Sequence, residues 1–240
     1  MIDPGTYDAF ARVAARQRDV LHAFEPGFEP ERSDVAGRPG VQPSADPLSV
    51  VAPQGTYFAA GGAGTDVSFT RAGAFAIEDG ELRFAGDTRA VLGFTFDRKP
   101  ALVPLRIDAY DAALGRVSGA RVEADGTFAY TRTTVDPRSG ERRSERVTVG
   151  RVALARFPAG TQPERIDATH VRAPQGVAAL VGAPGDGKFA ALTTHARDLG
   201  RVDLIAGLER MREAYDDLDA VRVANRARGS IERTMADLLK

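Results

Sequence analysis

The sequence predicts a mainly β fold framed by an α-helix at each end of the chain. Apolar residues recur at steps of three and four near the N-terminus, alternate with small or polar residues in the middle, and return to helical spacing near the C-terminus. These patterns predict an N-terminal helix over 1–25, a Pro/Gly-rich linker over 26–47, an antiparallel β-domain over 48–198 and a C-terminal helix over 199–240. With 240 residues, the chain is near the upper size that one hydrophobic core still serves.

The predicted N-terminal helix has one apolar face. Its members lie three, four or seven residues apart along the chain: Tyr7, Phe10, Ala14, Leu21 and Phe24. Asp3 and Pro4 suit a helix start, because Asp caps a first turn and Pro is tolerated there. Pro26 and Gly27 end the helix, and the further prolines up to Pro47 predict an extended or loosely ordered linker.

The middle of the chain contains two hairpin patterns. Two apolar side chains on each side of the Asp79-Gly80 turn alternate with other residues and are expected to enter one core: Phe75, Ile77, Leu82 and Phe84. A second hairpin is expected to join 127–135 to 145–157 through a turn at 136–140.

The predicted C-terminal helix carries a heptad-like apolar stripe. Its members follow 4-3-4-3 spacing: Leu204, Leu208, Met211, Tyr215 and Leu218. A helix of this span is about 55 Å long, more than a small β-domain can cover. Either the helix lies along its own domain, or it forms a coiled coil with the N-terminal helix that reaches into an assembly. The spacing at both chain ends favours the second alternative, with Tyr7, Phe10, Leu21 and Phe24 facing the C-terminal stripe as the assembly interface.

Composition and motifs give little support to catalysis. The 32 basic and 33 acidic side chains nearly cancel, so bulk charge does not favour nucleic acid. The chain has no Cys, which excludes a disulfide and a cysteine zinc site. His22, His170 and His195 are scattered without the i, i+4 spacing of a helical metal site. No Gly-x-Ser-x-Gly elbow is present, and we expect no catalytic, cofactor or metal site.

One loop resembles a phosphate-binding motif without its key hydroxyl. Residues 182–188 match Gly-x4-Gly-Lys, but Phe189 stands where Ser or Thr would bind magnesium. Asp186 inside the loop would repel a phosphate. We therefore expect no ATP or GTP binding. No run approaches eighteen apolar residues, so no membrane span is expected, and the first thirty residues lack the pattern of a Sec-type signal peptide.

An ordered set of short motifs resembles the bacterial flagellar basal-body rod and hook protein family. It comprises the segment Phe-Thr-Arg-Ala-Gly-Ala-Phe over 69–75, the turn at Asp79-Gly80, Val-Leu-Gly over 91–93, Asp-Gly-Thr over 125–127, Val-Gly-Arg-Val-Ala-Leu-Ala-Arg-Phe over 149–157 and Asp-Leu-Ile over 203–205. Two family segments are altered. The Asn-rich end of the N-terminal helix reads His22 to Pro30 here, and the Gln-Arg-Ala-Tyr segment survives only as Glu213-Ala214-Tyr215.

The resemblance implies a structural subunit of the flagellar rod, not an enzyme. Such a subunit is expected to leave the cell without a cleaved signal peptide and to self-assemble through its terminal helices and β-domain stacking in the periplasmic basal body. Its partners would be other rod or hook subunits and itself, with no nucleic acid and no small-molecule substrate. The alternative is a soluble, non-polymerising β-rich binding module derived from the same family, which the lost Asn-rich segment supports. An enzyme is a distant third.

Overall fold

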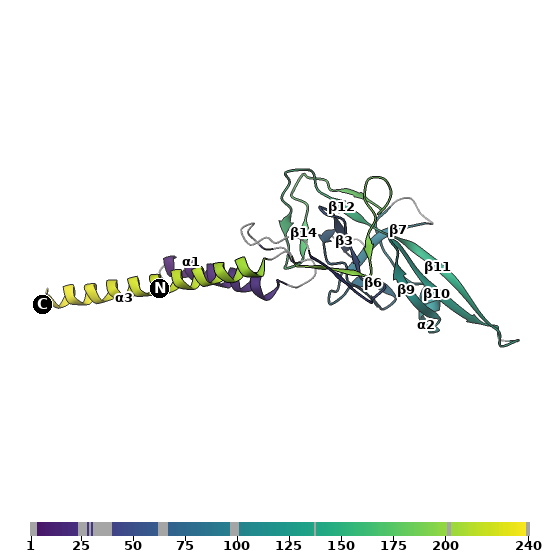
Figure 1. Cartoon of the computed structure of the whole chain (residues 1–240), viewed down its shortest axis with the longest axis horizontal. Helices are drawn as coiled ribbons and strands as arrows, with labels where there is room; N and C mark the ends of the chain where they lie inside the picture. Colours follow the sequence, from purple (N-terminus) through teal and green to yellow (C-terminus); the bar gives the residue numbers. More distant parts are fainter. Residues whose placement is uncertain are drawn as a thin grey trace. The chain divides into compact units, whose positions relative to one another are not determined.

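The computed structural model describes residues 4–23, 28, 30, 40–61, 67–96, 101–136, 138–200 and 203–238. The chain divides into two compact units. The helical unit is built on α1 (Pro4–Leu21) and α3 (Leu204–Leu238). The β unit spans Pro39–Leu199 together with Pro26–Phe28. The fold is therefore mainly β with a helix near each end, as the sequence predicts (Figure 1).

The β unit contains many short strands and one short helix. Their bounds are β1 (Gly40–Pro43), β2 (Val50–Val51), β3 (Tyr57–Gly61), β4 (Ser68–Thr70), β5 (Phe75–Glu78), β6 (Glu81–Phe84), β7 (Ala90–Thr95), β8 (Val103–Pro104), α2 (Ala109–Ala113), β9 (Val117–Val122), β10 (Thr127–Val135), β11 (Arg142–Val152), β12 (Leu154–Arg156), β13 (Glu164–Arg165), β14 (His170–Arg172), β15 (Leu180–Gly182), β16 (Thr193–Thr194) and β17 (Ala196–Leu199).

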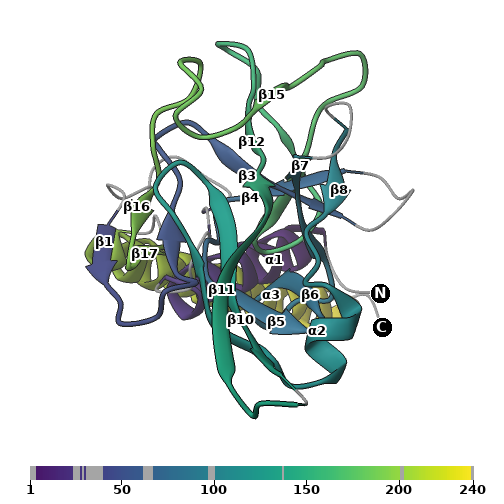
Figure 2. The ribbon, with the colours of Figure 1, turned by 90° about the vertical axis from the view of Figure 1, so that its right-hand side faces the viewer.

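A large antiparallel sheet organises these strands. Its main path runs β13-β14-β4-β3-β7-β11-β10-β9, and β12 joins β3 to β15 beside that path. The β5–β6 hairpin attaches to β7 through β6. Two small ribbons, β1–β17 and β2–β16, complete the unit. Figure 2 shows β10 and β11 as a long paired arm.

The first predicted hairpin is confirmed in pairing and register. Phe75 faces Phe84 and Ile77 faces Leu82 across β5 and β6. Phe75, Leu82 and Phe84 are buried, and Ile77 packs against the same cluster at partial exposure. Asp79 and Gly80 have φ values of 52° and 75°, the left-handed conformation that a two-residue hairpin turn of type I′ requires.

The second predicted hairpin is confirmed in its pairing, but its predicted second strand over 145–157 is divided. Only Arg142–Val152 form β11, whereas Leu154–Arg156 form β12, which pairs with β3 and β15. Strand β10 pairs with β11 from Thr127–Arg151 to Val135–Arg142, with an irregularity between Phe128 and Ala129. Strand β11 already begins at Arg142, a few residues earlier than the pattern predicts. The early start is allowed because backbone pairing continues through polar residues that carry no alternating apolar signal.

The core of the β unit lies on both faces of its central strands. The larger cluster includes Phe58, Val91 and Leu154, while their sequence neighbours Ala59 and Leu92 belong to a second cluster. Successive residues of a strand point to opposite faces, so β3, β7 and β12 are covered on both sides. The β unit therefore has a hydrophobic interior of its own.

The predicted linker over 26–47 needs correction at its C-terminal end. Residues Gly40–Pro43 form β1, which pairs with β17 in the register Gly40–Leu199 to Pro43–Ala196. Proline is tolerated in such a strand because β1 is an edge strand. Most of the remaining predicted linker lies outside the described residues. The β unit thus begins before the predicted boundary at residue 48.

In the helical unit, α1 and α3 pack side by side and run antiparallel. Gln17 contacts Tyr215, whereas Thr6 contacts Asn225, so the partner number on α3 falls as the number on α1 rises. With 18 and 35 residues, the helices are about 27 Å and about 52 Å long at 1.5 Å per residue. Helix α3 is therefore much longer than its partner.

Candidate functional site

Small and medium apolar side chains form the contact between α1 and α3. Ala9 and Val13 on α1 are buried together with Ala214 and Leu218 on α3, and Val221 packs against them. Each helix thus contributes residues spaced by four, which share one helical face. The contact is narrow, because these few residues form the whole apolar cluster described between the helices.

The predicted α1 face does not make this contact. Tyr7, Phe10 and Leu21 are 68%, 47% and 78% exposed, and Phe24 lies outside the described residues. Tyr7, Phe10 and Leu21 are therefore not members of the apolar cluster between α1 and α3, and their role as an assembly interface stays a prediction. The apolar spacing identified residues that share a side, but Ala9 and Val13 allow a closer approach of the backbones and occupy the interface instead.

The predicted α3 stripe is only partly buried. Leu218 is buried, Leu204 and Met211 are half-buried, and Leu208 and Tyr215 remain 44% and 41% exposed. The stripe therefore lies partly at the α1 contact and partly beside it. Its role as an interface with another molecule stays a prediction.

Several of the exposed apolar residues of the two helices gather on one side of the pair. The guanidinium of Arg222 on α3 lies 5.3 Å from the ring centre of Phe10, and the Gln17 amide donates a hydrogen bond to the Tyr215 hydroxyl. These contacts place Phe10 and Tyr215 on the same side. Helical spacing adds further members, and we call this set the apolar side: Tyr7, Phe10, Leu21, Leu208 and Tyr215.

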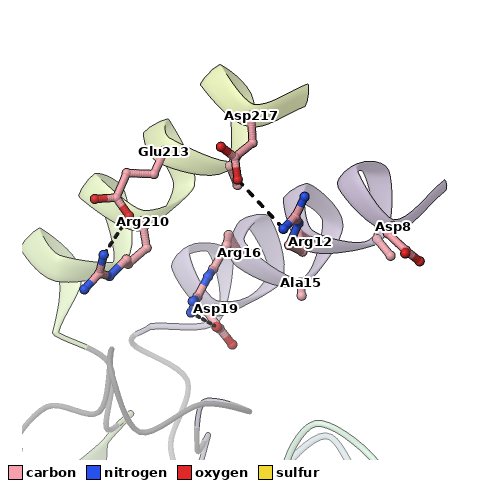
Figure 3. Close-up of a pocket in the computed structure, with 10 residues that line it drawn as sticks. Asp8, Arg12, Ala15, Arg16, Asp19, Arg210, Glu213 and Asp217 are labelled. Atoms are coloured by element: carbon pink, nitrogen blue, oxygen red, sulfur yellow. Dashed lines mark hydrogen bonds and ion pairs between the residues drawn. The ribbon is translucent and has the colours of Figure 1, made fainter. Parts of the chain in front are cut away.

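The other side of the pair is a groove with charged walls. Its volume is about 710 Å³. The lining residues are Asp8, Ala11, Arg12, Ala15, Arg16, Asp19, Arg210, Glu213, Ala214 and Asp217, and we call this surface the charged groove (Figure 3). Arg210 pairs with Glu213 at 2.7 Å, and Arg12 reaches Asp217 at 3.9 Å across the two helices. Alanines provide a shallow floor between these charges.

Helix α3 extends beyond α1. The contact of Thr6 with Asn225 places the start of α1 near the middle of α3, as Figure 1 also shows. Beyond that level, Ile231 and Met235 are 60% and 59% exposed. Within the described residues, nothing covers these two side chains. A long helix with apolar residues that no described part of the chain covers is therefore a candidate contact surface.

In the Gly-rich loop over 182–188, the side chain of Asp186 occupies backbone N–H groups. The carboxylate of Asp186 accepts hydrogen bonds from the backbone N–H groups of Lys188 at 2.8 Å, Phe189 at 3.1 Å and Ala183 at 3.3 Å. A phosphate in such a loop needs these same donors. The loop geometry thus supports the expectation, drawn from Phe189, that no nucleotide binds there.

A buried histidine joins two loops of the β unit. His170 is 2% exposed, and its Nδ1 lies 3.1 Å from Asp167 while its Nε2 lies 3.3 Å from Asp87. Arg89 pairs with both carboxylates, at 3.0 Å to Asp87 and 2.8 Å to Asp167. We call these four residues the histidine clamp. Sequence inspection missed it because its members come from two turns about eighty residues apart, after β6 and within the β13–β14 hairpin.

The pKa values of His170 and Asp167 are both lowered in the clamp. Burial, followed by the charge of Arg89, lowers the pKa of His170 despite the opposing carboxylates. Burial acts to raise the pKa of Asp167, but hydrogen bonds from Thr169 and His170 and the His170 charge bring that pKa down to about 2. No group of three or more acidic or histidine side chains in the described part of the chain has the geometry of a metal site. The clamp is best understood as a connection between loops.

Arg71, from the motif over 69–75, forms a buried ion pair. Its Nη2 lies 2.9 Å from Oδ2 of Asp198, and both side chains are at most 3% exposed. The guanidinium also donates to the carbonyl oxygen of Thr56 at 2.8 Å. The pair ties β17 to the loops around β3, which gives this arginine a structural role.

Comparisons with known proteins add no relative to this picture. No protein-family model matches the chain, and no curated protein matches it significantly. Within the described residues, neither long helix is apolar enough over a sufficient length to cross a membrane.

Proposed function

We propose that this protein is a structural subunit that self-assembles, and that its assembly is of the bacterial flagellar rod type. The observation that carries the proposal is the apolar side of the helical unit. Five large side chains of α1 and α3 are 41–78% exposed there, although both helices already have a partner in the chain. A surface of this kind typically marks a contact with another protein.

The energetics favour association through this side. Covering a large apolar side chain completely is worth about 1.5–3 kcal/mol. Partial covering of Tyr7, Phe10 and Leu21, the most accessible α1 members, would thus repay several kcal/mol of the cost of association. The narrow contact between α1 and α3 supplies little stability alone, so a neighbouring molecule would also stabilise the helix pair.

The rod assignment rests on the motif resemblance, and the structure of the β unit is compatible with it. Arg71 from the resembling segment is used for a buried ion pair, and the Gly-rich loop is filled by Asp186. Under this proposal, the protein acts in the flagellar basal body with other rod or hook subunits and copies of itself as partners. The second candidate is a β-rich binding module that does not polymerise, which the altered His22–Pro30 segment favours.

A charge on the apolar side tests the proposal. Leu208→Glu should abolish assemblies of the full-length protein larger than a dimer in sedimentation velocity, because it places a carboxylate among the residues to be buried. Thermal unfolding of the β unit should stay unchanged, since Leu208 is 44% exposed and belongs to the helical unit. Ala220→Glu is the matched control, because Ala220 is exposed on a different side of α3.

Two results would separate the candidates. Wild-type assemblies larger than a dimer that Leu208→Glu abolishes and Ala220→Glu preserves support a self-assembling subunit. A wild type that stays monomeric, together with a Leu208→Glu variant that unfolds the whole protein, contradicts it and favours the binding module.

A further inference from the structure

The charges of α3 are distributed unevenly along its length. Between Leu204 and Ala220 the helix carries five acidic and two basic side chains, whereas between Val221 and Leu238 it carries four basic and two acidic ones. The acidic half packs against α1, whereas within the described residues the basic half contacts α1 only through its first residues, 221–225, and otherwise extends beyond it. Helix α3 is therefore complementary in charge to a second copy lying antiparallel to it.

Three residues of the uncovered part share one helical face. Arg228, Ile231 and Met235 follow each other at steps of three and four, and we call them the distal stripe. The stripe continues the face of α3 that includes Asp217, because 217, 224, 228, 231 and 235 repeat at helical spacing. It therefore lies on the same side of α3 as the charged groove.

The charged groove has a matching set of residues on α1. Asp8, Ala11 and Ala15 follow each other at the same steps of three and four, and all three line the groove. Asp8 makes no ion pair within the described part of the chain and is exposed, while the alanines leave room for larger side chains. When α1 of one copy and the end of α3 of another run parallel, Arg228 meets Asp8, Ile231 meets Ala11 and Met235 meets Ala15.

We propose that the distal stripe of one copy docks in the charged groove of a second copy. In this arrangement the two α3 helices run antiparallel, because α1 is antiparallel to α3 in each chain. A two-fold axis then lets each copy place its stripe in the groove of the other, which gives a closed dimer with two identical contacts. The contact uses the side of the helix pair opposite to the apolar side and is independent of the rod-type assembly.

The same contact cannot form within one chain. The pairing of α1 with α3 places Ala15 near residue 216, so Met235 lies about 28 Å further along α3 at 1.5 Å per residue. A direct bond between positions 15 and 235 therefore reports two copies. The chain has no Cys, which makes engineered cysteines specific probes.

Cysteine cross-linking tests the geometry. The full-length double variant Ala15→Cys/Met235→Cys should give a covalent dimer under mild oxidation, because the docked residues come within the reach of a disulfide. Each single variant should give no such dimer. The control variant Ala15→Cys/Val223→Cys should also give none, since Val223 is equally exposed but lies on another side of α3.

Charge exchange tests the recognition. Asp8→Arg and Arg228→Glu should each abolish the dimer in sedimentation velocity, whereas the combined variant and an equal mixture of the two single variants should regain it. Unchanged helix content in circular dichroism would show that the helices remain folded. Leu208→Glu should leave this dimer intact.

A wild type without a dimer, or a dimer that survives both single reversals, overturns the docking proposal. If oligomers sensitive to Leu208→Glu persist in that case, the self-assembling subunit still stands. If the dimer behaves as expected but Leu208→Glu has no effect on any larger species, the subunit proposal fails alone.

Discussion

The two units of this protein differ in how completely each buries its own apolar residues. In the β unit, Phe58, Phe75 and Phe84 are at most 3% exposed and stack edge to face, with ring centres 5.2 Å and 5.4 Å apart. In the helical unit, the apolar cluster consists of a few small or medium side chains, while the aromatic residues Tyr7 and Phe10 stay exposed.

Under the proposed function, this difference separates a unit with a complete core of its own from a unit that contacts neighbouring molecules. The β unit also pairs its buried charges, as Arg71 and Asp198 show. The helical unit instead presents charges in an open groove and apolar residues on the opposite side. The β unit buries its large apolar side chains, whereas the helix pair leaves several of its own exposed. This combination fits a subunit whose helices pack against neighbouring molecules.

The largest expected effect is the loss of a core aromatic residue in the β unit. Phe75→Ala should lower the free energy of unfolding by about 3–5 kcal/mol, because it removes a buried ring and leaves a cavity. Phe10→Ala is the matched control and should change the stability of the β unit very little, since Phe10 is 47% exposed in the helical unit. Denaturant unfolding measures both, and similar losses for the two variants would refute the contrast.

A smaller effect is expected for the buried leucine of the helical unit. Leu218→Ala should cost the helix pair about 2 kcal/mol, the low end for such a change, because its surroundings are partly open. The loss should appear in the helical signal of circular dichroism during heating and leave the transition of the β unit in place. Simultaneous loss of both transitions would show that the two units do not unfold separately.

The smallest effect concerns the histidine clamp and acid. The pKa of Asp167 is lowered from 3.8 to about 2, so its contribution to stability is complete above pH 3.8 and is lost as the pH falls towards 2. After allowance for the partial exposure of this carboxylate, the loss amounts to about 1 kcal/mol. The lowered pKa of His170 also makes stability fall as the pH falls. Below about pH 6.5 the imidazole takes up a proton in the unfolded chain before it does so in the folded protein.

Variants of the clamp provide the check. Asp167→Asn should flatten the fall in stability of the β unit between pH 4 and pH 2, measured by denaturant unfolding at each pH. Asp79→Asn, at the exposed turn between β5 and β6, should keep the fall of the wild type. An unchanged acid response in Asp167→Asn would mean that other carboxylates govern it.

The local elements of the fold follow from patterns in the sequence. The alternation of Phe75, Ile77, Leu82 and Phe84 around Asp79-Gly80 predicted a hairpin whose register the structure confirms. Hairpins of this kind are predictable because residues close in sequence decide both the turn and the side-chain alternation. The long C-terminal helix was predictable for the same reason, since its spacing is a local property.

Which surfaces are buried and which remain exposed depends instead on long-range packing. The spacing of Tyr7, Phe10 and Leu21 indicates a shared side, but the contact with α3 falls on Ala9 and Val13, because the closest approach of two helices depends on both partners. The histidine clamp likewise depends on two turns brought together by the sheet. Sequence spacing therefore identifies the residues that share a face of a helix or strand, whereas contacts between distant segments determine which of these faces is buried.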